Sequence, residues 1–287
     1  MRKVNEALKE LRVGKNMSLA DATRGVCTAT ALSNYESGDT KDIQFGNLRG
    51  ILANMRVSMS EFEYVLNGYQ GSYYFELSKK VSDLYQQRNV LVLNDLREEL
   101  EKKATSKHDQ IFCLMIKRLL SHLDSSVKLS KEEIFFIDDF FSRFDHWGYF
   151  EISLYNNLLD TFSPNFVVEV SNKLANDSLF YEHIPENKTL IITCLLNTVS
   201  TLIRHDYYTD ARLFLKRLKP LLDENHLLQK NQWHFLFGNL NVALDYKKGY
   251  EIMKESIEVF RLLNCTNELE RHLAGYKVIK DYYSKNK

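Results

Sequence analysis

Residues that could carry out catalysis occur in this sequence, but not in the spacing that catalysis requires. The chain contains no P-loop, HExxH or GxSxG motif, and its eight histidines show no paired ligand spacing. Cys27 is expected to be a buried structural thiol rather than a nucleophile or redox sensor. Glu132 and Glu133 are adjacent on an expected helix, so their carboxylates point in different directions. We therefore predict that the protein is not an enzyme and holds no metal or cofactor.

Polar side chains suited to binding are more informative. Asn197 interrupts the apolar segment Leu190–Ile203, where a buried, unpaired amide would cost about 1–3 kcal/mol. An amide carries a donor and an acceptor, so at a groove it could bind the backbone of an extended peptide. Alternatively, Asn197 bonds a carbonyl of a neighbouring helix and only fixes packing. Arg204 lies two helical turns further on and could meet a peptide carboxylate, and weaker lining candidates are Asn156, Trp233, Phe237 and Asn241.

The elements that must position these residues are helices. The chain has 287 residues, of which 44% are hydrophobic, enough for one large or two modest domains. Only 3 Pro and 11 Gly occur over this length, which favours helices over a turn-rich β fold. Lys and Arg total 38, as do Asp and Glu, so any site for nucleic acid must be local. Four widely spaced cysteines suit a reducing cytoplasm, and no apolar run is long enough to span a membrane.

Residues 1–67 are predicted to form five short helices. The spacings Ser18–Asp21 and Ser58–Glu61 are typical of capping boxes at helix starts. A tight turn at residues 25–27 joins the second and third helices, which is the helix-turn-helix pattern, although any small helical bundle would share it. Residues 1–56 hold nine Lys and Arg against six Asp and Glu, a modest positive excess.

Residues 72–287 change in character, with a boundary expected near residues 68–72. Long apolar-periodic segments alternate with short polar turns, and three helices open on a small or turn residue followed by Tyr, at Tyr149, Tyr207 and Tyr250. The spacing is irregular, but the helix–turn–helix layout favours a superhelical stack similar to tetratricopeptide (TPR) repeats. The predicted fold is therefore all-α, with a lambda-repressor-like helix-turn-helix domain at 1–67 and a TPR-like repeat at 72–287.

The whole chain resembles the Rgg/GadR/MutR family of helix-turn-helix regulators. The resemblance is carried by residues 8–12 (LKELR), 18–21 (SLAD), 32–38 (LSNYESG), 58–62 (SMSEF), 147–151 (WGYFE) and 253–265 (MKESIEVFRLLNC). It implies a cytoplasmic homodimer whose repeat domain binds a short signalling peptide in a concave groove, as in quorum sensing. The family's third helix often carries arginines where this chain has Asn34 and Ser37, so contacts made by those arginines do not carry over.

In helix-turn-helix proteins the N-terminal part of the second motif helix meets base edges in the major groove. This geometry predicts that Thr28, Thr30, Ser33 and Asn34 face the bases, unless the threonines only cap the helix. The expected phosphate contacts are Arg12, Lys15, Arg24 and Lys41. Useful affinity requires two heads on a palindromic or two-half-site operator in double-stranded DNA. The surface for dimerisation is expected in the C-terminal helices, at Phe260, Leu262, Leu263, Tyr276, Ile279 and Tyr282.

Two other functions fit the same pattern. A helical-repeat scaffold could bind a protein partner through a head that does not read DNA. A helix-turn-helix repressor could instead respond to a metabolite, or to a redox signal at Cys27.

Overall fold

The computed structural model of the chain is helical throughout the residues it describes, which are 2–144, 147–181, 185–244 and 248–285. Contacts divide the chain into two units, Met1–Asn89 and Val90–Lys287. The first unit contains α1 (Val4–Gly14), α2 (Leu19–Thr23), α3 (Ala29–Ser37), α4 (Phe45–Asn54), α5 (Met59–Leu66) and α6 (Tyr73–Gln86). The second contains α7 (Val90–Lys103), α8 (Lys107–Leu123), α9 (Lys131–Ser142), α10 (Tyr149–Leu158), α11 (Pro164–Tyr181), α12 (Pro185–Arg204), α13 (Tyr208–Leu218), α14 (Leu227–Ala243), α15 (Lys248–Leu262) and α16 (Thr266–Lys285), with short 3-10 turns after α10 and α13 and before α14.

The first five helices enclose their own hydrophobic core, which confirms the predicted five-helix head. The core side chains all lie between Val4 and Leu66, and Leu8, Ile51 and Leu32 are almost completely buried. Ser58 caps α5 through the Glu61 amide (3.1 Å), while the Glu61 carboxylate accepts from the Ser58 amide (2.6 Å). Local hydrogen bonding therefore fixes where this helix begins.

The boundary between the two units lies later than the sequence predicted. Helix α5 ends at Leu66, close to the expected end of the head at 67, but α6 groups by its contacts with the first unit. The predicted domains at 1–67 and 72–287 differ from the two contact units mainly in the assignment of α6. The apolar periodicity of α6 gave no indication of which unit it would join.

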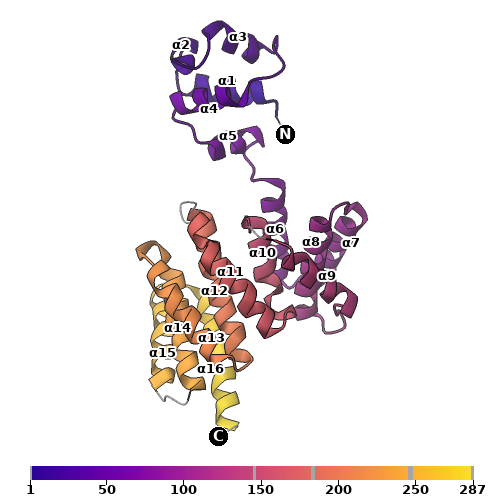
Figure 1. The fold of residues 1–287 in the computed structure, drawn as a ribbon, viewed down its shortest axis with the longest axis vertical. Coiled ribbons are helices and arrows are strands. Elements are labelled where there is room, and N and C mark those ends of the chain that lie inside the picture. The colour runs from indigo at the N-terminus through magenta and orange to yellow at the C-terminus, as the bar shows by residue number, and fades with distance from the viewer. Residues whose placement is uncertain (1, 145–146, 182–184, 245–247, 286–287) are drawn as a thin grey trace. The chain divides into compact units, whose positions relative to one another are not determined.

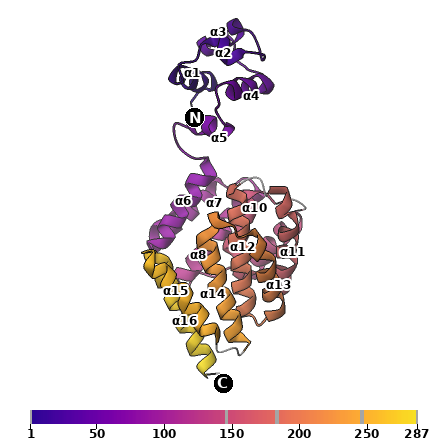
Figure 2. The ribbon, with the colours of Figure 1, turned by 90° about the vertical axis from the view of Figure 1, so that its left-hand side faces the viewer.

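The second unit is built from two layers of helices, as the predicted TPR-like repeat requires. Helices α8, α10, α12, α14 and α16 each contact the next along the row, while α7, α11, α13 and α15 pack against members of this row (Figure 1). Figure 2 shows α12 and α14 side by side in this row. Residues far apart in the sequence are therefore brought onto one continuous surface.

Aromatic packing and a close helix crossing stabilise the second unit. Trp147 stacks on Phe141 with ring centroids 5.2 Å apart, and Tyr155 meets the Trp147 ring edge-on at the same distance. At the α14–α15 crossing, a Cβ on Gly249 would lie 2.5 Å from the Gly238 carbonyl oxygen, so the two backbones approach because both positions lack side chains. Among the described residues, no helix is both long and apolar enough to cross a bilayer.

Candidate functional site

Helices α2 and α3 form a helix-turn-helix whose turn is held by specific bonds. Gly25 adopts a positive φ of 73°, a backbone conformation that glycine adopts without strain. The Asn54 amide of α4 donates to the carbonyl oxygens of Ala22 (2.9 Å) and Arg24 (3.0 Å), which closes the end of α2. Thr28 then begins α3 by accepting from the Ala31 amide at 3.1 Å. Thr28 therefore has the capping role that the sequence left open as an alternative.

The outer face of α3 carries the small polar side chains expected to face DNA. Thr30, Ser33 and Asn34 are all exposed, at the i, i+3, i+4 spacing that places them on one helical face. The opposite face buries Leu32 and Tyr35 in the core of the head. Asn34 thus presents its amide to solvent on a helix that is fixed from behind.

Arg12, which the sequence suggested as a phosphate contact, takes part in an ion pair within the head. Its guanidinium donates to both Glu36 carboxylate oxygens, from Nε at 2.7 Å and from Nη2 at 2.6 Å, and Nη1 donates to the Met17 carbonyl at 2.8 Å. The side chains of Arg12 and Glu36 are only 13% and 4% exposed. This ion pair joins α1 to α3 and fixes the orientation of the outward-facing helix. Lys15, Arg24 and Lys41 are exposed, although Arg24 forms a surface ion pair with Asp21.

A cleft of about 230 Å³ opens on the row of helices in the second unit. Helices α12, α14 and α16 line it, with Leu196, Phe235 and Leu236 as apolar walls. Its polar lining comes from Asn197 and Ser200 on α12, Gln232 on α14 and Arg271 on α16. The cleft therefore combines apolar walls with amide and hydroxyl groups and with one guanidinium, which is paired with Glu268.

Asn197 and Asn156 are brought together at this cleft. Asn197 is exposed, and its Nδ2 donates to Oδ1 of Asn156 on α10 at 2.9 Å. The acceptor is the side-chain carbonyl oxygen of a residue on a neighbouring helix, so the bond also agrees with the alternative in which Asn197 fixes helix packing. This bond does not use the Oδ1 acceptor of Asn197 or the Nδ2 donor of Asn156. One acceptor beside one donor is the complement of a peptide unit.

The other four residues predicted for this site lie elsewhere. Trp233 lines a separate cleft, donates from Nε1 to the Leu215 carbonyl at 2.8 Å and stacks on Phe237 at 5.3 Å. Asn241 donates to the Phe237 carbonyl of its own helix at 2.8 Å. Arg204 is exposed and donates to Thr201, outside the lining of the cleft at Asn197. The six residues thus do not form one site, because α14 turns Trp233 and Phe237 away from Gln232 and Leu236.

Comparison with known proteins identifies the family. Residues 93–273 match the model of the C-terminal domain of the HTH-type transcriptional regulator Rgg, which is more than half of the chain. The chain belongs to the Rgg family. This family consists of transcriptional regulators rather than enzymes.

Solved structures share the fold of this Rgg-family chain along nearly its whole length. The SHP pheromone receptor Rgg2 of Streptococcus dysgalactiae is 21% identical, with a TM-score of 0.81 over 96% of this chain and 99% of that one. A putative transcriptional regulator from Listeria monocytogenes is 16% identical, with a TM-score of 0.85 over 99% of each chain. PlcR of Bacillus thuringiensis, in complex with the peptide PapR7 and DNA, is 16% identical, with a TM-score of 0.65 over 95% of this chain and 99% of that one. These likenesses establish the all-α fold of a helix-turn-helix head and a helical repeat.

Sequence reasoning missed several residues of the cleft in this Rgg-family chain. Ser200 lies one turn after Asn197, so helical spacing could have found it. Gln232 and Arg271 both contact Glu268, at 3.5 Å and 2.6 Å, and no local pattern links α14 to α16. His272 lies between the rings of Phe235 and Phe260, where burial lowers its pKa and favours the neutral imidazole.

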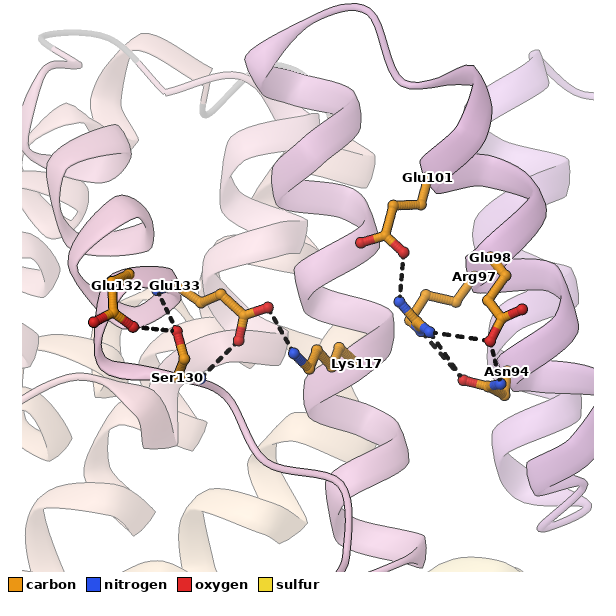
Figure 3. Close-up of polar contacts among 8 residues, drawn as sticks. All are labelled: Asn94, Arg97, Glu98, Glu101, Lys117, Ser130, Glu132 and Glu133. Atoms are coloured by element: carbon orange, nitrogen blue, oxygen red, sulfur yellow. Dashed lines mark hydrogen bonds and ion pairs between the residues drawn. The ribbon is translucent and has the colours of Figure 1, made fainter.

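A third cleft, of about 420 Å³, lies between α7, α8 and α9 and has Glu101, Glu132 and Glu133 on its rim. Figure 3 shows that these acids already have partners: Arg97 contacts Glu101 at 2.7 Å, Lys117 contacts Glu133 at 2.6 Å, and Ser130 donates to Glu132 at 2.7 Å. The Glu133 carboxylate also accepts from the Ser130 amide in a capping box. Glu132 and Glu133 therefore act separately, as the sequence predicted.

Cys27 lies beside the turn of the helix-turn-helix and is partly buried. Burial raises the pKa of its thiol, which lowers the fraction of reactive thiolate at neutral pH. This environment disfavours the alternative in which the Rgg-family head responds to a redox signal at Cys27.

Proposed function

We propose that this Rgg-family protein is a cytoplasmic, homodimeric DNA-binding regulator whose repeat unit binds a short signalling peptide. The observation that carries the proposal is the Asn156–Asn197 pair at the cleft on α12, α14 and α16. Relatives of the same fold support it, since Rgg2 is a pheromone receptor and PlcR is described with both a peptide and DNA.

The peptide would lie across the row of helices in an extended conformation. An extended backbone exposes one N–H and one C=O per residue, and the acceptor of Asn197 and the donor of Asn156, which their mutual bond does not use, would match such a unit. The apolar walls at Leu196 and Leu236 would take aliphatic or aromatic side chains of the peptide.

The test for peptide binding is native co-purification followed by mass spectrometry of small peptides. The parent protein should carry a peptide, whereas Asn197→Ala should carry none and should melt within a few degrees of the parent, because Asn197 is exposed. Asn157→Ala is the matched control, since its amide bonds only Ser153 of its own helix. Recovery of the same peptide with Asn197→Ala would contradict the proposal.

The head would read DNA through α3. Asn34 would bond adenine, a contact that contributes about 1–3 kcal/mol of discrimination, and Ser33 and Thr30 lie beside it on the exposed face. Lys15 and Lys41 would contact phosphates. The experiment is a gel shift with DNA flanking the protein's own gene, with Lys131→Ala in the repeat unit as the control. Failure of the parent protein to shift any of this DNA would favour the scaffold alternative.

Dimerisation would use the exposed apolar side chains of the last two helices. Leu262, Leu263 and Tyr282 are 80%, 62% and 52% exposed, whereas Phe260 is buried. Tyr276 and Ile279 pack against the core between α14 and α15, so they are removed from the expected surface. Light scattering should give about twice 33.7 kDa, and Leu262→Glu should give the monomer mass.

A further inference from the structure

The cleft around Trp233 is distinct from the cleft at Asn197. It has a volume of about 430 Å³, within the range of small-molecule sites, and lies between the end of α13 and the start of α14. Its apolar walls are Leu222, Leu227 and the Trp233 indole, and its polar lining includes Lys219, Lys230 and His234. None of its lining residues is an acid.

The charges of this cleft are unbalanced. Within the described part of the chain, no ion pair joins Lys219 or Lys230 to a carboxylate. Of the acids nearby, Asp223 is already occupied by Lys188 at 2.9 Å and His226 at 2.8 Å, and Glu255 contacts His234 of the cleft at 3.1 Å. Lys219 instead lies over the Trp233 ring, 6.0 Å from its centroid. Two ammonium groups beside an indole therefore leave a positive potential above an apolar surface.

The start of α14 and the packing of Trp233 shape this cleft. Helix α14 begins at Leu227, on the wall of the cleft. The Trp233 ring is held by its bond to the Leu215 carbonyl and by its parallel stack on Phe237, with an interplanar angle of 6°. The apolar wall is thus rigid before any ligand binds.

We propose that this cleft binds a carboxylate that carries a compact apolar group, with Lys219 and Lys230 on the carboxylate and Trp233, Leu222 and Leu227 around the apolar group. A free carboxylic acid and the C-terminus of a peptide share this chemistry. The site is independent of Asn197 and could therefore bind a second ligand of the regulator.

The experiment titrates the full-length protein with N-acetyl-L-leucine and, separately, with its neutral amide, N-acetyl-L-leucinamide. Tryptophan fluorescence is the readout, because Trp233 lines the cleft while the other tryptophan, Trp147, is only 2% exposed. The acid should change the emission saturably and the amide should not, and Trp233→Phe should remove the response. Equal responses to acid and amide would overturn the proposal without any variant being needed.

Substitutions then assign the charge. Lys230→Met should weaken binding of N-acetyl-L-leucine by about tenfold or more, since it removes a charge-assisted hydrogen bond. Lys216→Met is the matched control, because Lys216 is exposed on α13 and does not line the cleft; its binding should stay within about twofold of the parent. An unchanged affinity in Lys230→Met, with an unchanged melting temperature, would also refute the proposal.

Two arms distinguish the source of the carboxylate. The first arm compares N-acetyl-L-leucine with a hexapeptide that ends in leucine. If the hexapeptide binds at least about tenfold more tightly, and the same peptide with an amidated C-terminus does not, the occupant is a peptide terminus. Equal affinity of the two acids identifies a free acid. Asn197→Ala should leave both titrations unchanged, so failure at this cleft is distinguishable from failure of the proposed peptide groove.

Discussion

Removing either partner of the Arg12–Glu36 ion pair should destabilise the head by about 3 kcal/mol. Two charge-assisted hydrogen bonds join the pair, and each contributes about 1.5–3 kcal/mol when intact. Loss of one partner from a buried pair costs about 3–5 kcal/mol, because the other charge is left buried and unpaired. Glu36 is 4% exposed but Arg12 is 13% exposed, so partial solvation of the guanidinium places the expected value at the lower end.

Hydrogen exchange followed by mass spectrometry of the full-length protein would measure this change within the head alone. Because each 1.4 kcal/mol corresponds to a factor of ten, amides of α3 should exchange about 100-fold faster in Arg12→Met and in Glu36→Gln. The double variant should be little worse than either single one, since both remove the same interaction. Arg24→Met breaks only the exposed pair with Asp21 and should change exchange by less than about threefold.

DNA binding provides the refuting result. If Arg12 is structural, Arg12→Met should leave the salt dependence of DNA affinity unchanged for the folded fraction. The opposite result would be an Arg12→Met protein with normal exchange rates in which the slope of log affinity against log salt concentration is reduced by about one per head. That result would show that Arg12 contacts a phosphate, and the structural role would be wrong.

Three other predictions follow from single positions. Gly249→Ala should lower stability by about 1–3 kcal/mol in thermal melting, because its Cβ would meet the Gly238 carbonyl oxygen at 2.5 Å, whereas Gly275→Ala, with its nearest atom at 3.8 Å, should be close to neutral. Burial lowers the pKa of His272 in the native state, so below its ordinary pKa of 6.5 the unfolded chain binds a proton that the native chain does not. The melting temperature should therefore fall as the pH is lowered from about 6.5 toward the lower native pKa. A His272→Gln variant whose melting temperature depends on pH in the same way would contradict this. In competition gel shifts, Asn34→Ala should relax sequence preference while Lys15→Ala should weaken all sequences about equally, and identical specificity profiles for Asn34→Ala and the parent would rule out base reading.

Features set by neighbouring residues could be predicted from the sequence. The capping box at Ser58–Glu61 forms as expected, because it depends on two side chains three residues apart. At Ser18 the cap forms, but the Asp21 carboxylate accepts from the Ser18 hydroxyl instead of completing the box. The predicted five helices of the head follow from the same local rules.

Features set by tertiary packing could not. Arg12 and Glu36 are 24 residues apart, and a surface basic residue on α1 has the same sequence pattern whether it contacts phosphate or a buried acid. Asn156 and Asn197 were chosen separately, yet they meet only because α10 and α12 are neighbours in the row of helices. Conversely, Trp233 looked suited to the same groove, but the rotation of α14 about its axis depends on its packing against α13 and α15.

The arrangement of charges in the head has a consequence for DNA recognition. Arg12 is used internally, Arg24 is paired with Asp21, and the positions at which related regulators often carry arginine hold Asn34 and Ser37 here. Ser37 donates to Asp39 at 2.6 Å, which places a negative charge at the end of α3. Arg12 and Arg24 are therefore poorly placed to contact phosphates, and a single head should bind DNA weakly. Specific binding would then require two heads to contact two half-sites at the same time. If Leu262→Glu separates the proposed dimer, it should therefore abolish specific DNA binding as completely as a substitution on the exposed face of α3.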